Sequence, residues 1–305
     1  MRCVATLACW AQCPCASCKL LMTQTPLTFA DHNRDVMGLT HVYPVVSRRA
    51  AGVSVGINLN TNNACNWACV YCQVPNLTRG PAPKTDLTLL RSELNTMLAA
   101  IQTGTFMQSY VPEDLRRLND IAFSGNGEPT SAEDFEAAVQ VAIEAMTAHN
   151  LIGIIKLVVI TNGSFAHEPA VQRAFQAMAA ANGEIWFKCD RGRTQDILRI
   201  NKINVTPEQV LRRLGAAAAA CPTWVQTCMV SWDGVPPSEE EVVAWLSLLQ
   251  RALRLNIPLR GVLLYSLVRP SFQPDATRIA ALPLAWLEAL GERVKALGLE
   301  VKVTP

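Results

Sequence analysis

From about residue 52 onward, the apolar positions of the chain follow two alternating patterns. Short, nearly continuous apolar runs indicate buried strands, and between them apolar residues recur at the three- and four-residue spacing of a helix. The strand-like runs cover 52–59, 120–125, 156–160, 184–189, 223–230 and 259–268. Strand–helix units in succession predict an α/β fold in which helices cover a parallel sheet, with its chemistry at the carboxyl ends of the strands.

The expected helices carry recognisable signals. They include segments at 88–101, 169–180 and 284–297, and a short strand is expected at 301–303. A capping box pairs a serine or threonine with a glutamate or glutamine three residues later, at the start of a helix. Three pairs have this spacing: Thr206 with Gln209, Ser238 with Glu241, and Thr130 with Glu133. We therefore expect helices to begin at these three places.

Composition narrows the class of protein. The chain has 305 residues, of which 50% are hydrophobic, and its formal net charge is +2. This balance does not indicate a strongly basic nucleic-acid binder, and no apolar run approaches the roughly 18 residues of a membrane-spanning helix. Without a repeat or a linker, residues 52–305 are interpreted as one domain and 22–51 as its lead-in.

The eleven cysteines are unevenly spread. Residues 1–21 form a cysteine-rich leader whose spacings fit no standard site, and we interpret it as a dispensable or non-native extension. A second metal site in the leader is the alternative. The cysteines after the leader do not form a disulfide pattern, and a reducing cytoplasm is the expected location.

Three cysteines stand out by their spacing. Cys65, Cys69 and Cys72 form a C-x3-C-x2-C motif, and Tyr71 directly precedes the third. Three thiolates without a fourth suit a cubane iron–sulfur cluster that keeps one iron open for a ligand. Structural zinc sites usually close with four ligands, one more than this motif supplies. A zinc-binding structural domain is kept as an alternative interpretation.

Two polar turns follow the next two strands. The first has the sequence Gly125, Asn126, Gly127, Glu128 and Pro129, and the second contains Asn162, Gly163 and Ser164. Glycine lets a backbone approach a ligand closely, and Glu128 could accept hydrogen bonds from an ammonium group. Because the cysteine motif also follows a strand, we expect all three segments to meet at one mouth of the sheet.

This combination resembles the radical S-adenosylmethionine (radical SAM) superfamily over about residues 52–270. The resemblance implies a partial (βα)6 barrel, with a 4Fe–4S cluster at its mouth held by Cys65, Cys69 and Cys72. The open iron would bind SAM. The implied SAM contacts are Tyr71 beside the adenine, the turn of Gly125, Asn126, Gly127, Glu128 and Pro129, then Asn162 and Ser164 at the ribose, and Lys188 and Asp190. The turn matches the family's G-G-E-P element, with Asn126 where a glycine is usual.

The resemblance also implies a function. Reductive cleavage of SAM would give a 5′-deoxyadenosyl radical that abstracts hydrogen from a substrate, as in an oxidoreductase or transferase. The implied partners are a reductant such as flavodoxin or ferredoxin and an unidentified substrate: a small molecule, a peptide or RNA. A non-catalytic iron–sulfur electron-transfer protein is the alternative of another class.

Candidate substrate contacts lie at the ends of the later strands: Gln226, Trp232, Asp233, Tyr265 and Arg269. Segment 66–73 is most similar to the branch of wyosine-type tRNA-modifying enzymes. The low net charge is not that of a typical tRNA binder, whose affinity depends on phosphate contacts. RNA modification is therefore one option for the substrate.

Overall fold

The computed structural model describes residues 27, 37–47 and 52–304. Its centre is a sheet of eight strands in the order β1-β2-β5-β6-β7-β8-β10-β12. The strands are β1 (Val42–Ser47), β2 (Gly52–Ile57), β5 (Leu118–Phe123), β6 (Lys156–Thr161), β7 (Gly183–Lys188), β8 (Thr223–Cys228), β10 (Leu259–Tyr265) and β12 (Glu300–Thr304). Only β1 is antiparallel to its neighbour. The predicted α/β class with a mostly parallel sheet is confirmed.

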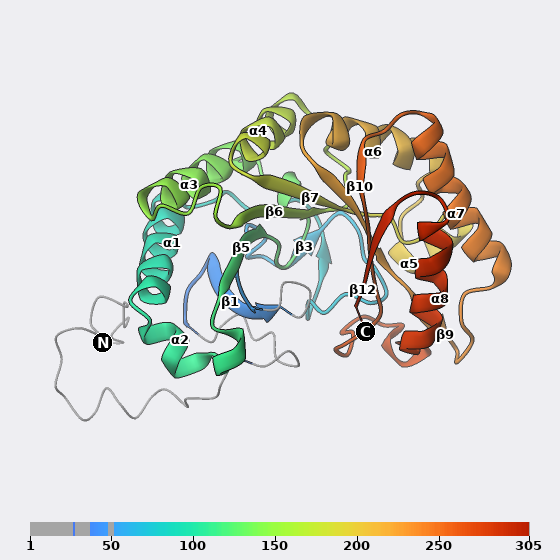
Figure 1. The fold of residues 1–305 in the computed structure, drawn as a ribbon, viewed down its shortest axis with the longest axis horizontal. Helices are drawn as coiled ribbons and strands as arrows, with labels where there is room; N and C mark the ends of the chain where they lie inside the picture. Colours follow the sequence, from blue (N-terminus) through green and yellow to red (C-terminus); the bar gives the residue numbers. More distant parts are fainter. Residues whose placement is uncertain (1–26, 28–36, 48–51, 305) are drawn as a thin grey trace.

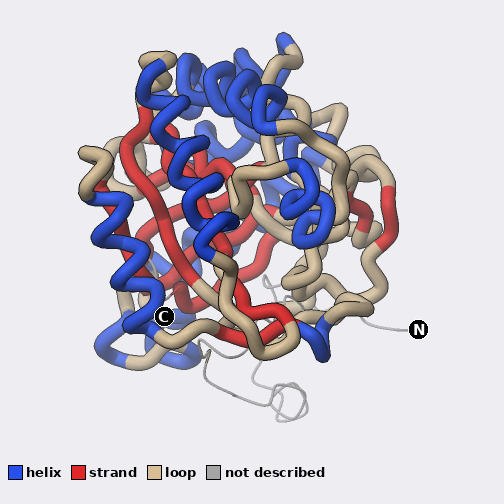
Figure 2. Tube along the Cα trace, turned by 90° about the vertical axis from the view of Figure 1, so that its right-hand side faces the viewer, coloured by secondary structure: helices blue, strands red, loops and turns tan. Residues whose placement is uncertain are grey.

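Helices form an arc outside this sheet (Figure 1), and the turned view shows the strands inside them (Figure 2). One long helix follows each parallel strand from β2 to β10. They are α1 (Leu87–Gln102), α3 (Phe135–Ala148), α4 (Pro169–Ala180), α6 (Pro207–Ala220), α7 (Glu239–Arg254) and α8 (Leu284–Lys295). Among the described residues, no helix is long and apolar enough to cross a membrane.

Two of the three predicted capping boxes are present. At α6 and α7, the side chains of Thr206 and Ser238 accept from the third helical residue, whose own side chain accepts from the cap backbone. The box predicted at Thr130 is wrong, because Thr130 lies in the 3-10 turn η4 (Pro129–Ser131) and α3 begins only at Phe135. In the structure its hydroxyl donates to Glu128 Oε1.

Several short elements were not predicted. β1 lies in the segment interpreted as lead-in; it is an edge strand and contains Pro44, which a sheet tolerates there. The helix α5 (Thr194–Asn201) lies between β7 and α6, and α2 (Thr105–Tyr110) follows α1. The predicted strand 223–230 is divided, because β8 ends at Cys228 and the chain enters β9 (Val230–Trp232), which pairs with β11 (Ile279–Ala281).

The remaining short elements are β3 (Ala64–Cys65), which pairs with β4 (Thr78–Arg79), and the 3-10 turns η3 (Glu113–Leu115) and η5 (Ala276–Arg278).

Two clusters of buried hydrophobic side chains pack the sheet, the helices and the cysteine loop together. The larger lies between sheet and helices, where Phe135 makes edge-on contacts with Phe123 and Phe175 at centroid distances of 5.5 and 6.2 Å. The smaller one lies behind the cysteine loop and includes Trp67, Val70 and Ile200. Apolar side chains from the loop itself are therefore buried against α5, which anchors the loop that carries the cysteines.

Candidate functional site

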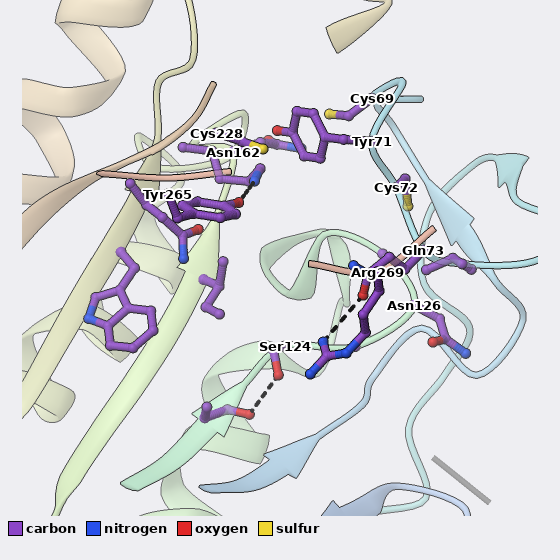
Figure 3. A pocket seen from close by; sticks show the side chains of 18 of the residues that line it. Cys69, Tyr71, Cys72, Gln73, Ser124, Asn126, Asn162, Cys228, Tyr265 and Arg269 are labelled. Atoms are coloured by element: carbon purple, nitrogen blue, oxygen red, sulfur yellow. Dashed lines mark hydrogen bonds between the residues drawn. The ribbon is translucent and has the colours of Figure 1, made fainter. Parts of the chain in front are cut away.

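A cavity of about 310 Å³ opens at the carboxyl ends of the strands. Predicted site residues from four separate segments line it: Cys65, Cys69, Tyr71, Cys72, Gly125, Asn126, Gly127, Glu128, Asn162 and Lys188. Figure 3 shows the cysteine loop on one side of this cavity and Tyr265 on the other. The expected meeting of the three motifs at one mouth is thus observed. Pro129, Ser164 and Asp190 lie outside the cavity lining.

The cysteine loop holds its sulfur atoms with nitrogen donors. The backbone N–H of Trp67 donates to Cys65 Sγ at 3.4 Å, and Asn201 Nδ2 donates to Cys69 Sγ at 3.3 Å. Burial raises the pKa of Cys65 to about 12 and that of Cys69 to about 11. These thiols would ionise only with a compensating positive charge, as a bound metal supplies.

The donor set fits an iron–sulfur cluster in its chemistry. Three thiol groups from one loop line one cavity, and thiolates are the usual ligands of such clusters. Across residues 37–47 and 52–304, no three His, Cys, Asp or Glu side chains are grouped tightly enough to hold a single metal ion.

Glu128 joins the two polar turns. Its side chain is 3% exposed, and Oε1 accepts from the Thr130 backbone N–H at 3.2 Å and from the Thr130 and Thr161 hydroxyls at 2.5 Å. Oε2 accepts from the Asn162 backbone N–H at 2.6 Å. Burial raises the pKa of this carboxyl, and the hydrogen bonds offset part of that effect. The ammonium contact of Glu128 stays a prediction; in the structure its oxygens accept hydrogen bonds from residues of both turns.

Asn126 connects its turn to the chain that precedes the cysteines. Its side-chain Nδ2 donates to Asn63 Oδ1 at 2.6 Å, and its backbone N–H donates to Asn58 Oδ1 at 3.1 Å. The side chain that departs from the usual glycine thus makes a contact that a glycine could not make.

Sequence reasoning missed this set of asparagines. Asn60 Nδ2 donates to Ala64 O at 2.9 Å, and Asn66 Oδ1 accepts from Asn162 Nδ2 at 2.8 Å. The available signal was composition, because five of the nine residues in 58–66 are asparagine. Asparagine is favoured where side chains must bond nearby backbone in turns.

Ser164 and Asp190 act behind the wall of the cavity. Ser164 Oγ accepts from Trp67 Nε1 at 3.2 Å, which fixes the cysteine loop. Asp190 is 2% exposed, and its Oδ2 accepts from Tyr71 OH at 2.5 Å and from Asn201 Nδ2 at 2.7 Å. In this structure both residues orient loop residues that do face the cavity.

Side chains from β7, β8 and β10 form another wall of the cavity. Lys188 and Gln226 are partners in adjacent strands, and Lys188 Nζ lies 3.4 Å from Tyr265 OH and 4.8 Å from the Tyr71 ring centroid. Gln226 is 1% exposed, and its Oε1 has no hydrogen-bond partner in the described part of the chain. Cys228, two residues further along, also lines this wall and was not predicted to do so.

The candidate substrate contacts separate into two groups. Gln226, Tyr265 and Arg269 line the cavity. Trp232 and Asp233 do not: Asp233 pairs with Arg278 at 2.6 Å, and the same guanidinium lies 4.4 Å from the Trp232 ring centroid. The chain turns into β9 after Cys228, which carries these two residues away from the mouth.

No protein-family model matches the chain. Two curated proteins from Helicobacter pylori, both called UPF0026 protein, are 26% and 25% identical to it over 165 residues. The match covers 52% of this chain and 48% of each relative, so the chain spans about half the length of the curated relatives it matches.

Solved structures give wider coverage. A structure of TYW1 with a lysine-pyruvate adduct bound has a TM-score of 0.53 at 13% identity, covering 82% of this chain and 74% of that one. A radical SAM methyltransferase from Sphaerobacter thermophilus has a TM-score of 0.55 at 14% identity, covering 86% of this chain and 68% of that one. These likenesses confirm the resemblance seen in the sequence at the level of the fold: the chain has the fold of the radical SAM enzymes.

Proposed function

We propose that the chain is a radical SAM enzyme whose Cys65, Cys69 and Cys72 hold a 4Fe–4S cluster. Once bound, the cluster would supply the electron that cleaves SAM to methionine and a 5′-deoxyadenosyl radical, which takes hydrogen from the substrate. One observation carries this proposal: the three cysteines line the same cavity as the turn 125–128 and Asn162. A non-catalytic electron-transfer protein would not need these two turns.

The protein's own part is to bind and orient. Glu128 fixes the backbone of both turns relative to each other, since it bonds Thr130 and Thr161 as well as Asn162. The turn 125–128 therefore presents its backbone groups to the cavity in one arrangement, as preorganised binding of a polar ligand requires. Asp190 and Asn201 hold Tyr71 from behind, which keeps its ring on the cavity wall.

The opposite wall is the proposed place of the substrate. Gln226 and Tyr265 line it, and Arg269 lines the cavity beside Gln73; none of the three belongs to the cysteine triad or to the two turns. The substrate, the reductant of flavodoxin or ferredoxin type and the cytoplasmic location are part of the proposal. A small molecule, a peptide or RNA is compatible with the polar wall, and the net charge of +2 gives no particular support to RNA.

The Gln226→Leu variant tests whether this wall is built for a ligand. A buried polar atom without a partner costs about 1–3 kcal/mol, so an apolar side chain of similar size should keep or raise the free energy of unfolding. As a comparison, Thr161→Val removes a hydroxyl that donates to Glu128 and should lower the free energy of unfolding. Denaturant titration measures both. If Gln226→Leu were the more destabilised variant, Gln226 would be a structural residue.

Anaerobic reconstitution with iron and sulfide tests the proposed metal site. We expect about four iron atoms per chain and broad visible absorption, as cysteine-bound clusters give. The reconstituted protein should then bind SAM in equilibrium dialysis, whereas an electron-transfer protein would hold the cluster without binding SAM. Stoichiometric zinc with no visible absorption would instead establish the zinc-binding alternative.

A further inference from the structure

The segment 269–273, which follows β10, lies against the second half of the cysteine loop about 200 residues earlier in the chain. The Ser271 hydroxyl lies 2.7 Å from Val70 O and 3.1 Å from Cys72 O. Its oxygen accepts from the Gln273 backbone N–H at 3.0 Å, which leaves its single proton for the two carbonyls. The hydroxyl thus connects both sides of the tight bend at Tyr71.

Gln273 bonds the same stretch of backbone. Its side-chain Nε2 donates to Val74 O at 2.9 Å and to Cys72 O at 3.3 Å. Both partners are carbonyl oxygens, which can only accept, so the amide orientation is fixed by chemistry. Each of the two amide protons has its own acceptor, one on either side of Gln73.

The backbone of the segment adds to this contact. The Phe272 N–H donates to Cys72 O at 3.1 Å, so donors from Ser271, Phe272 and Gln273 all surround this one carbonyl. The Phe272 side chain is 63% exposed, which means that apolar packing does not account for the position of the segment. The hydrogen bonds from the segment to the cysteine loop account for its position.

The other side of the cysteine loop is held by α5. The Val70 N–H donates to Ile200 O at 2.8 Å, and Asn201 Nδ2 donates to Cys69 Sγ. The loop is therefore bonded at Cys69 by α5 and at Cys72 by the segment 269–273. The same segment reaches the cavity, where Arg269 Nη1 lies 3.5 Å from Gln73 Oε1 (Figure 3).

We propose that Ser271 and Gln273 are positioning residues that hold Cys72 where its sulfur can join Cys65 and Cys69 on one cluster. This inference rests on the proposed function. Without these side-chain donors, the Cys72 carbonyl would keep only the Phe272 N–H and the bend would loosen, so the Cys72 thiolate would leave the cluster more readily. Supporting residues of metal ligands typically change affinity by roughly 10- to 100-fold.

The test follows loss of the reconstituted cluster to excess EDTA, read as the decay of visible absorption under anaerobic conditions. Gln273→Glu places an oxygen against two carbonyls, and we expect its cluster to bleach at least roughly tenfold faster than that of the wild type. Gln273→Ala and Ser271→Ala remove donors without adding repulsion and should bleach faster by a smaller factor. Ser271→Thr retains the hydroxyl, so its cluster should bleach at the wild-type rate.

Gln172 provides a matched control on α4. Its side-chain Nε2 also donates to two backbone carbonyls, Ala166 O at 2.5 Å and Ala216 O at 3.0 Å, and it does not line the cavity. Gln172→Glu should lower the melting temperature and keep the wild-type bleaching rate. Equal rates in Gln273→Glu, Gln273→Ala and the wild type would overturn the inference. A wild-type protein that takes up no cluster would contradict the proposed function itself.

Discussion

Replacing Cys69 by alanine is expected to abolish retention of the cluster and to lower SAM cleavage by more than about a hundredfold. Even supporting residues around a metal cost up to about that factor, and the loss of a ligand should cost more. Cys69 is buried on the cavity wall, where its Sγ accepts from Asn201 Nδ2. Iron content after desalting and absorption in the visible range measure how much of the cluster is retained.

Cys221 supplies the control. It is buried like Cys69, but it does not line the cavity. Cys221→Ala should hold the same amount of iron as the wild type. Full iron content and full SAM cleavage in Cys69→Ala would show that the ligand set is assigned incorrectly.

Gly127→Ala is expected to separate the turn 125–128 from the cysteine loop. A Cβ atom at this position would lie 2.0 Å from Ala64 O and 2.6 Å from Asn60 Cγ. Ala64 directly precedes Cys65, and its carbonyl is part of the backbone, so the contact cannot be relieved by rotating a side chain. The two segments must move apart, and overpacking of this kind costs about 1–3 kcal/mol.

The expected result for Gly127→Ala is SAM affinity weaker by at least about tenfold, equivalent to about 1.4 kcal/mol, and a lower melting temperature. Equilibrium dialysis against labelled SAM measures the affinity. Gly80→Ala is the matched control, because Gly80 directly follows the nearby strand β4 and a Cβ there would meet only the Ala64 side chain at 3.7 Å. If both variants bound SAM like the wild type, this turn would not be part of the SAM site.

Local signals in the sequence predicted most of the fold. The boundaries of α4 and the capping boxes of α6 and α7 depend on residues within a few positions of each other, and they agree with the structure. The box at Thr130 has the same spacing and is wrong, because Thr130 lies in the turn η4 and α3 begins only at Phe135. Spacing alone cannot show whether a threonine hydroxyl accepts from a helix N–H or lies in a turn and donates to a carboxylate.

The candidate site was predictable where motifs end adjacent strands. Cys65, Gly125 and Asn162 follow β2, β5 and β6, which are neighbours in the sheet. The rest depends on contacts between distant segments, such as Asp190 with Tyr71, or Ser271 with Val70. Periodicity carries no information on such pairs, because it reports only which face of an element is buried.

The proposed function depends on one reaction, the reductive cleavage of SAM. The most direct measurement of it is product analysis after anaerobic incubation of the reconstituted protein with SAM and dithionite. We predict methionine and 5′-deoxyadenosine in equal amounts, formed by the wild type and not by Cys69→Ala. The absence of both products from a wild-type protein with its full complement of iron would contradict the proposal that this chain is a radical SAM enzyme.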